Sequence, residues 1–200
     1  MTQEFSNFGD NAQISMQSNV IGSETVGIEG AYHVVCRDAE GNVKWEQEFP
    51  NLVNAVGKQL MLDTLLSGTS YTTVGPYLGL ISGTSLTFAA ADTMASHTWS
   101  EFTNYTVGGS AVRGTAVFAS ATSTGTTPTN VTTKTATAIT YTITGAGGTV
   151  GGCFLVTGSG ASSTQGNTSG TLYSAGAFAT AKVTTAGDTV SVTYSTTATS

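Results

Sequence analysis

The chain has 200 residues, of which 39% are apolar and only 9% charged, and its net charge is −6. This length suits one domain, with or without an arm, and is enough to bury a sizeable core. With six Lys and Arg residues and no basic cluster, nucleic acid is not expected as a direct partner, and no apolar run reaches the roughly 18 to 20 residues of a membrane span.

The first 28 residues are polar and rich in Asn, Gln, Ser and Gly. They show no sustained periodicity, which predicts an extended N-terminal arm (residues 1–28) followed by one domain (residues 29–200). A polar arm is held in place only by contact, either with a neighbouring subunit or with its own domain. The start has neither the basic nor the apolar region of a cleaved signal peptide, so we expect no export by that route.

Residues 31–49 predict a β-hairpin whose turn is Ala39–Asn42. In its second strand Val43, Trp45 and Phe49 alternate with charged residues, so one face is expected in a core. After Pro50 the pattern becomes helical. Apolar residues lie all around the helix up to Gly68, and this predicts a single long helix that is buried. The residues are Leu52, Val53, Val56, Leu60, Met61, Leu62, Leu65 and Leu66.

Beyond Gly68 the chain is punctuated by Gly, Ser, Thr and Pro, with short β-prone segments between. The predicted strands are Tyr77–Ile81, Arg113–Phe118, Ile139–Ile143, Cys153–Val156, Thr171–Tyr173 and Thr189–Tyr194. Many short strands joined by turns predict an all-β domain: a sandwich, a jelly roll or a barrel.

The second half of the chain is almost free of charge. Between Ser120 and Ser200 the only charged residues are Lys134, Lys182 and Asp188. Proteins usually guard exposed strand edges with charges, because unpaired edges recruit other chains. The edges are therefore expected to be covered by loops or by partner chains, and we favour partners. The composition indicates a subunit of a larger assembly.

Few residues offer catalytic or metal-binding chemistry. His33 and Cys36 are an odd number of positions apart on a predicted strand, so their side chains should point to opposite faces and not bind one ion. Cys36 and Cys153 are too few for a disulfide framework, and we interpret both as small buried hydrophobic residues, with pairing left open.

A second histidine, His97, follows Asp92 and Ser96, which suggests a catalytic triad. A triad is defined by geometry and no nucleophile-elbow motif is present, so a short turn or helix, with Asp92 near its start and Trp99 anchoring its end, is the preferred interpretation. We therefore expect that the protein is not an enzyme. We expect no catalytic, metal-binding or cofactor-binding residues and no cofactor.

Three further patterns are weak signals. The glycine-rich stretches Gly145–Gly148 and Gly158–Gly160 lack the features of phosphate-binding loops and predict turns. The Asn-x-Ser/Thr sequences at Asn104, Asn130 and Asn167 are expected by chance in a Thr-rich chain. A last group of aromatic residues suggests a sugar-binding platform, although aromatic residues in β proteins more often fill cores and interfaces. These are Tyr71, Tyr77, Trp99, Phe102 and Tyr105.

Four segments make the chain similar to a family of small structural proteins of tailed bacteriophages. They are YLGLISG (77–83), AADTMASH (90–97), WSEFTNY (99–105) and AGDTVSVTY (186–194). The resemblance covers residues 31–200, and AADTMASH is its most specific part.

This resemblance implies a virion component of jelly-roll or sandwich type without catalytic residues. The expected function is that of a capsid decoration or cement protein on the outer surface of the head, made in the host cytoplasm. Its expected partners are the major capsid protein and copies of itself, as a trimer or dimer. The alternative is a tail, collar or fibre component that contacts the host surface, where a glycan would be a partner.

Overall fold

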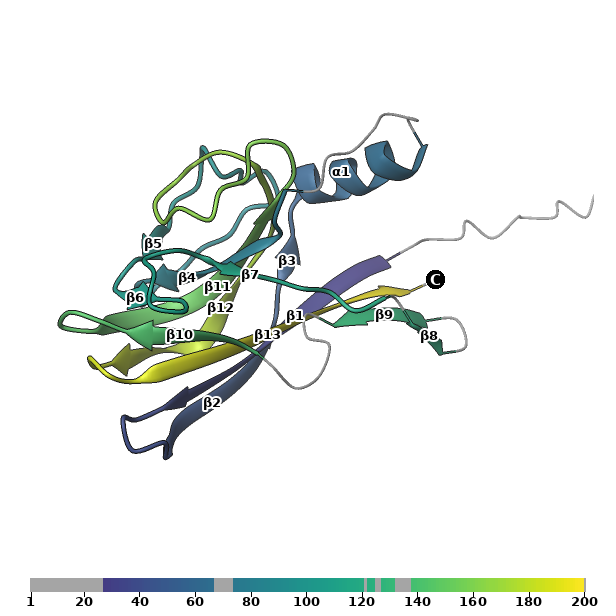
Figure 1. Cartoon of the computed structure of the whole chain (residues 1–200). Coiled ribbons are helices and arrows are strands. Elements are labelled where there is room, and N and C mark those ends of the chain that lie inside the picture. Colours follow the sequence, from purple (N-terminus) through teal and green to yellow (C-terminus); the bar gives the residue numbers. More distant parts are fainter. Residues whose placement is uncertain (1–26, 67–73, 121, 125–126, 132–137, 200) are drawn as a thin grey trace, which may run out of the picture.

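The computed structural model describes residues 27–66, 74–120, 122–124, 127–131 and 138–199. Two antiparallel β-sheets pack face to face, and one helix stands at the end of the pair (Figure 1). This confirms the predicted all-β sandwich. Of the predicted arm, residues 1–26 lie outside the described part, whereas Gly27 and Ile28 already belong to the first strand.

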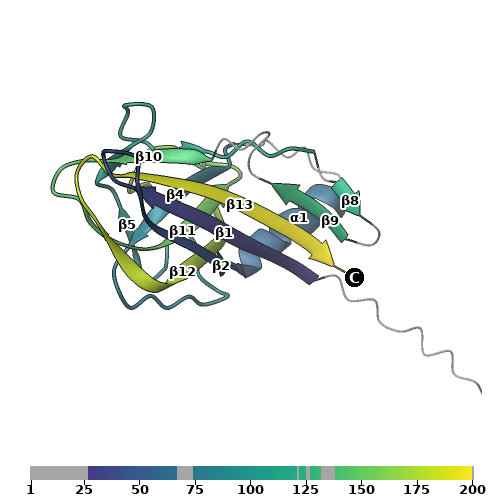
Figure 2. The ribbon, with the colours of Figure 1, turned by 90° about the horizontal axis from the view of Figure 1, so that it is seen from below.

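The first sheet is built on the pairing of two strands from opposite ends of the chain. Strand β1 (Gly27–Arg37) runs antiparallel to β13 (Thr189–Thr199) along its whole length, and Figure 2 shows the two side by side. The sheet order is β2-β1-β13-β10-β6, with β9 also paired to β13 and β8 paired to β9. The remaining strands are β2 (Val43–Pro50), β6 (Tyr105–Thr106), β8 (Thr122–Thr124), β9 (Thr127–Val131) and β10 (Ile139–Ile143). The predicted hairpin is confirmed as β1 and β2.

The second sheet has the order β3-β12-β11-β4-β5, with β7 also paired to β4. Its strands are β3 (Leu52–Val53), β4 (Tyr77–Ser82), β5 (Ser100–Phe102), β7 (Gly114–Thr115), β11 (Gly148–Thr157) and β12 (Thr171–Thr184). Strand β12 is much longer than the predicted Thr171–Tyr173. Its second half alternates Ala with Thr and Lys, so it has little hydrophobic contrast, and pairing with β11 is what extends it. The predicted strand Arg113–Phe118 is reduced to β7.

The main core lies between the two sheets. Val190, Val192 and Tyr194 of β13 are buried there, as their alternation predicts. They meet large side chains from both sheets, among them Leu80 of β4. Val43 was predicted to share this core, but it is exposed because it lies at the first position of β2, next to the hairpin turn.

The second sheet is buried on its other face too. Ile81, Phe154 and Leu172 project there into a second cluster, which is covered by the segment that carries Met94 and Trp99. Because both faces are covered, β11 is apolar without alternation from its buried cysteine onward. Among the described residues, irregular segments and no third layer of regular structure cover this face.

The helix α1 (Ala55–Leu66) corrects the prediction of a buried helix. Leu62 is 58% exposed and Leu66 is 79% exposed. The helix packs on one side only, against β12, and Figure 1 shows it standing out from the end of the sandwich. Asn54 starts it, since its carbonyl accepts the hydrogen bond of the Lys58 N–H, so the two apolar residues before Asn54 form β3 instead of a first turn.

Candidate interaction surface

His33 and Cys36 lie on opposite faces of β1, as predicted. The His33 ring is about half exposed on the outer face, with Nε2 2.7 Å from Glu46 Oε1. Cys36 is buried in the core, and so is Cys153. Both thiols are free. Burial raises the pKa of Cys36 to about 11 and raises that of Cys153 as well, so both behave as small apolar residues.

The residues of the suggested triad are not brought together. His97 stacks on Trp99, with ring centroids 3.7 Å apart, and its Nδ1 donates to the Trp99 carbonyl at 2.8 Å. Asp92 accepts instead from the Ala89 N–H at 3.0 Å. The carboxylate therefore holds the local backbone and does not orient the imidazole.

The third member of the suggested triad, Ser96, belongs to a tight turn. Its N–H donates to the side-chain oxygen of Thr93 at 3.1 Å. The Thr93 and Ser96 backbones also exchange both of their hydrogen bonds, which closes the turn. Of the turn or helix that the sequence predicted here, the structure forms the turn.

The suggested sugar-binding platform is not formed by the described aromatic residues. Trp99, Phe102 and Tyr105 are buried, and Tyr77 is partly buried against the second cluster. Tyr71 lies outside the described residues. These rings fill the two cores, which is the commoner use of aromatic residues in β proteins.

The glycine-rich stretches are turns, as predicted. Gly145 and Gly147 have positive φ in the turn between β10 and β11, and Gly158 and Gly160 have positive φ after β11. Positive φ favours glycine because a Cβ would be strained there. Asn104, in the first of the glycosylation-like sequences, uses its side-chain amide to bind the Gly147 carbonyl at 2.8 Å.

The sequence reasoning missed a buried ion pair between Arg113 and Glu101. The Arg113 side chain is 1% exposed and that of Glu101 is 7% exposed, and two hydrogen bonds of 2.9 and 2.7 Å join the guanidinium to the carboxylate. The guanidinium also donates to the carbonyls of Ser162 and Asn167 and lies 5.1 Å from the ring centroid of Phe154. Only the rarity of charge in this chain could have indicated that these two residues matter.

This ion pair fastens a loop onto the second sheet. Glu101 lies on β5, and its second oxygen also accepts the Gly166 N–H at 2.7 Å. Nearly all donors of Arg113 are used inside the protein, so the pair has little left to offer a ligand. Its role is structural.

A second ion pair joins Lys44 of β2 to Asp188, which precedes β13, at 2.6 Å. Burial alone would raise the pKa of Asp188, but the hydrogen bonds from Lys44 and from the Thr185 N–H outweigh it and hold the pKa below its usual value. The hydrogen bond to Asp188 correspondingly raises the pKa of Lys44. Both groups stay charged near neutral pH, which suits a clamp between two hairpin turns and not acid–base chemistry.

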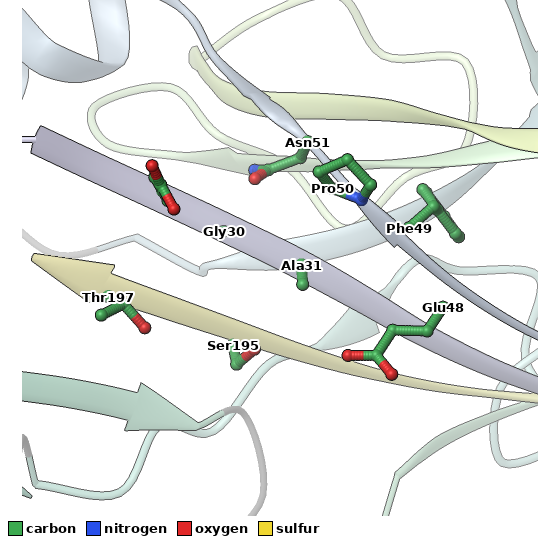
Figure 3. Close-up of a pocket in the computed structure, with 9 residues that line it drawn as sticks. Gly30, Ala31, Glu48, Phe49, Pro50, Asn51, Ser195 and Thr197 are labelled. Carbon is green, nitrogen blue, oxygen red and sulfur yellow. The ribbon is translucent and has the colours of Figure 1, made fainter.

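A hollow of about 640 Å³ lies where β1 begins and β2 ends. Figure 3 shows Ser195 and Thr197 of β13 along one side of β1, and Pro50 and Asn51 at the end of β2 along the other. Asn51 donates its side-chain N–H to the Tyr194 hydroxyl at 3.0 Å. A side chain at Gly30 would collide with that hydroxyl. The hollow is open and its lining mixes polar and apolar atoms, so it suits contact with another surface better than enclosure of a small molecule.

The outer face of α1 is an apolar exposed feature of the described surface. Leu62 and Leu66 are two of five large hydrophobic residues that are exposed in the described part of the chain. The others, Val43, Val117 and Val183, lie apart from the helix in the sequence. Two exposed leucines one turn apart on one helix indicate a surface for protein contact.

Within the residues that the structure describes, no group of three or more His, Cys, Asp and Glu side chains could hold a metal ion. None of the described helices is long and apolar enough to cross a membrane. No family model, curated protein or solved structure matches the chain.

Proposed function

We propose that this chain is a structural subunit of a tailed-bacteriophage particle, most specifically a capsid decoration or cement protein. In this role it binds between subunits of the major capsid protein on the outer surface of the assembled head. Copies of the chain also contact one another. The jelly-roll form of the sandwich belongs to the same proposal.

One observation carries the proposal: a helix with apolar residues on all sides lies outside the core, with Leu62 and Leu66 exposed. A helix of this composition is normally buried, so a partner chain is the natural cover. The scarcity of charge supports the same view, since a surface made of hydroxyls and small side chains packs closely against a neighbour. The resemblance of segments within residues 77–105 to phage structural proteins favours a phage particle as the assembly to which this chain belongs.

A cement protein stabilises a shell because it binds the assembled lattice and not the free subunits. Purified chain is therefore expected to sediment with expanded, undecorated heads and to raise their melting temperature. It should not bind unassembled capsid protein. Heads that already carry a full set of this chain are the control, and they should take up no more.

The same particles decide between this function and the alternative of a tail, collar or fibre component. Gold-labelled antibody against the chain should decorate the head surface. Label confined to the tail, together with no binding to undecorated heads, would overturn the capsid assignment in favour of the alternative.

A further inference from the structure

The exposed face of α1 has the spacing of a coiled-coil seam. The helix rests on Tyr173 of β12 through Gly57, and successive residues are rotated by about 100°. The positions on the side opposite Gly57 are Ala55, Gln59, Leu62 and Leu66. Their spacing of four, three and four residues is that of alternating d and a positions of a heptad repeat.

Two charged residues lie on opposite sides of this seam. Lys58 occupies the g position and Asp63 the e position, and both are exposed. In a parallel pair of helices the g position of one copy faces the e position five residues later in the other copy. Lys58 would then face Asp63 of the second copy, twice in each pair. In an antiparallel pair, g faces g and e faces e, so Lys58 would not face Asp63 and neither charge would meet its opposite.

We propose that α1 packs in parallel against α1 of a second copy of this chain, about a rotation axis that runs along the helix. Leu62 and Leu66 of each copy bury their exposed surface at this seam, and the two Lys58–Asp63 pairs set its orientation. Figure 1 shows α1 standing out from the end of the sandwich, and the side chains of Leu62 and Leu66 are exposed. The inference names a surface for self-association, and it holds or fails independently of the phage assignment.

The charge pattern selects a second copy as the occupant, because the same helix supplies both members of each pair. A helix of 12 residues is short, and the contact is much smaller than the roughly 1,600 Å² of a typical stable interface. The association should therefore be weak in solution and favoured where copies are held close together.

A disulfide cross-link tests the parallel geometry. Leu66→Cys places a thiol at an a position, where two parallel copies bring the side chains together, whereas an antiparallel pair separates them. Mild oxidation of this variant should give a covalent dimer on a non-reducing gel. Val183→Cys is the matched control, because Val183 is also exposed but lies on β12. The natural cysteines are buried and should not react.

Charge reversal tests the pairing. By sedimentation velocity, Lys58→Glu should raise the concentration needed for association by about ten-fold, since attraction becomes repulsion at two sites. Lys58→Asp combined with Asp63→Lys should restore it. Circular dichroism checks that each variant keeps its fold.

Three results would overturn this inference. The first is a wild-type chain that stays monomeric at all concentrations up to about 1 mM, where a weak association of this kind is detected. The second is equal cross-linking of the Leu66→Cys and Val183→Cys variants. The third is an association that Lys58→Glu leaves unchanged. Binding of the chain to phage heads affects none of these readings, so the two proposals fail separately.

Discussion

Arg113 and Glu101 are two of the few charged residues in this chain, and both side chains are withdrawn from solvent. Burying charges is costly unless they are paired and hydrogen-bonded. Here the guanidinium makes two hydrogen bonds to the carboxylate and donates to two backbone carbonyls as well. The pair holds irregular segments in place over the second sheet. At the residue scale, this ion pair thus helps to hold a loop without strands in place, together with backbone contacts such as the hydrogen bond from the Arg113 N–H to the Ser163 carbonyl.

Replacing Arg113 by Met should leave the Glu101 carboxylate buried without its partner. We expect a loss of about 3 to 5 kcal/mol in the free energy of unfolding, measured by urea denaturation. The double variant Arg113→Met, Glu101→Leu should recover a large part of this loss, because no charge is then buried.

The control for this prediction is Arg37→Met. Arg37 is exposed and donates to the Gly41 carbonyl, so its loss should change the free energy of unfolding by no more than about 0.5 kcal/mol. Equal effects of the two Arg substitutions would contradict the structural role of the buried pair.

At the scale of elements, α1 shows how a local pattern can be correct about type and wrong about burial. Apolar residues on all sides predicted a helix, and a helix forms. Its burial depends on which elements cover it, and among the described elements it lies along β12. Gly57 permits this contact, because a Cβ there would come 2.7 Å from the Tyr173 carbonyl oxygen.

Substituting Gly57 by Ala has two opposite effects on stability, one from helix propensity and one from packing. Propensity alone would stabilise the protein by about 1 kcal/mol, whereas the collision with the β12 backbone should cost about 1 to 3 kcal/mol. Since backbone atoms shift less readily than the end of a side chain, we expect the variant to be less stable overall. The midpoint of its urea denaturation should therefore be lower.

Thr64→Ala is the matched control within α1, because Thr64 is exposed. It should be neutral or slightly stabilising through helix propensity. A midpoint that rises for Gly57→Ala as it does for Thr64→Ala would show that α1 does not lie against Tyr173.

At the scale of the whole molecule, the sandwich is closed by strands from its two ends. Gly27 of β1 pairs with Thr199 of β13, so the first sheet forms only when two segments far apart in the sequence come together. Pairing between residues so distant in sequence makes folding slow, because a long loop must close first. The described fold starts at β1. A deletion that ends just before β1 and one that ends within it therefore test whether the predicted arm is separate from the core.

Deletion of residues 1–26 should leave every strand pair of β1 intact. We expect the melting temperature to change by less than about 2 °C, because the free energy of unfolding should change by less than about 1 kcal/mol, while uptake into undecorated heads becomes weaker. Deletion of residues 1–32 is the contrast, since it removes Tyr32 from the core and half of β1, and this protein should unfold. A large drop in melting temperature for the shorter deletion would place the arm in the core.

Local patterns in the sequence determined the all-β class, the hairpin at residues 31–49, β10 and the start of β13, because alternation and turn residues act over a few neighbours. They also placed His33 and Cys36 on opposite faces. Only the tertiary structure decided that β12 runs on to Thr184, that Arg113 meets Glu101 and that the two leucines of α1 stay exposed. Each of these depends on which distant segments come into contact, and a local pattern carries no information about them.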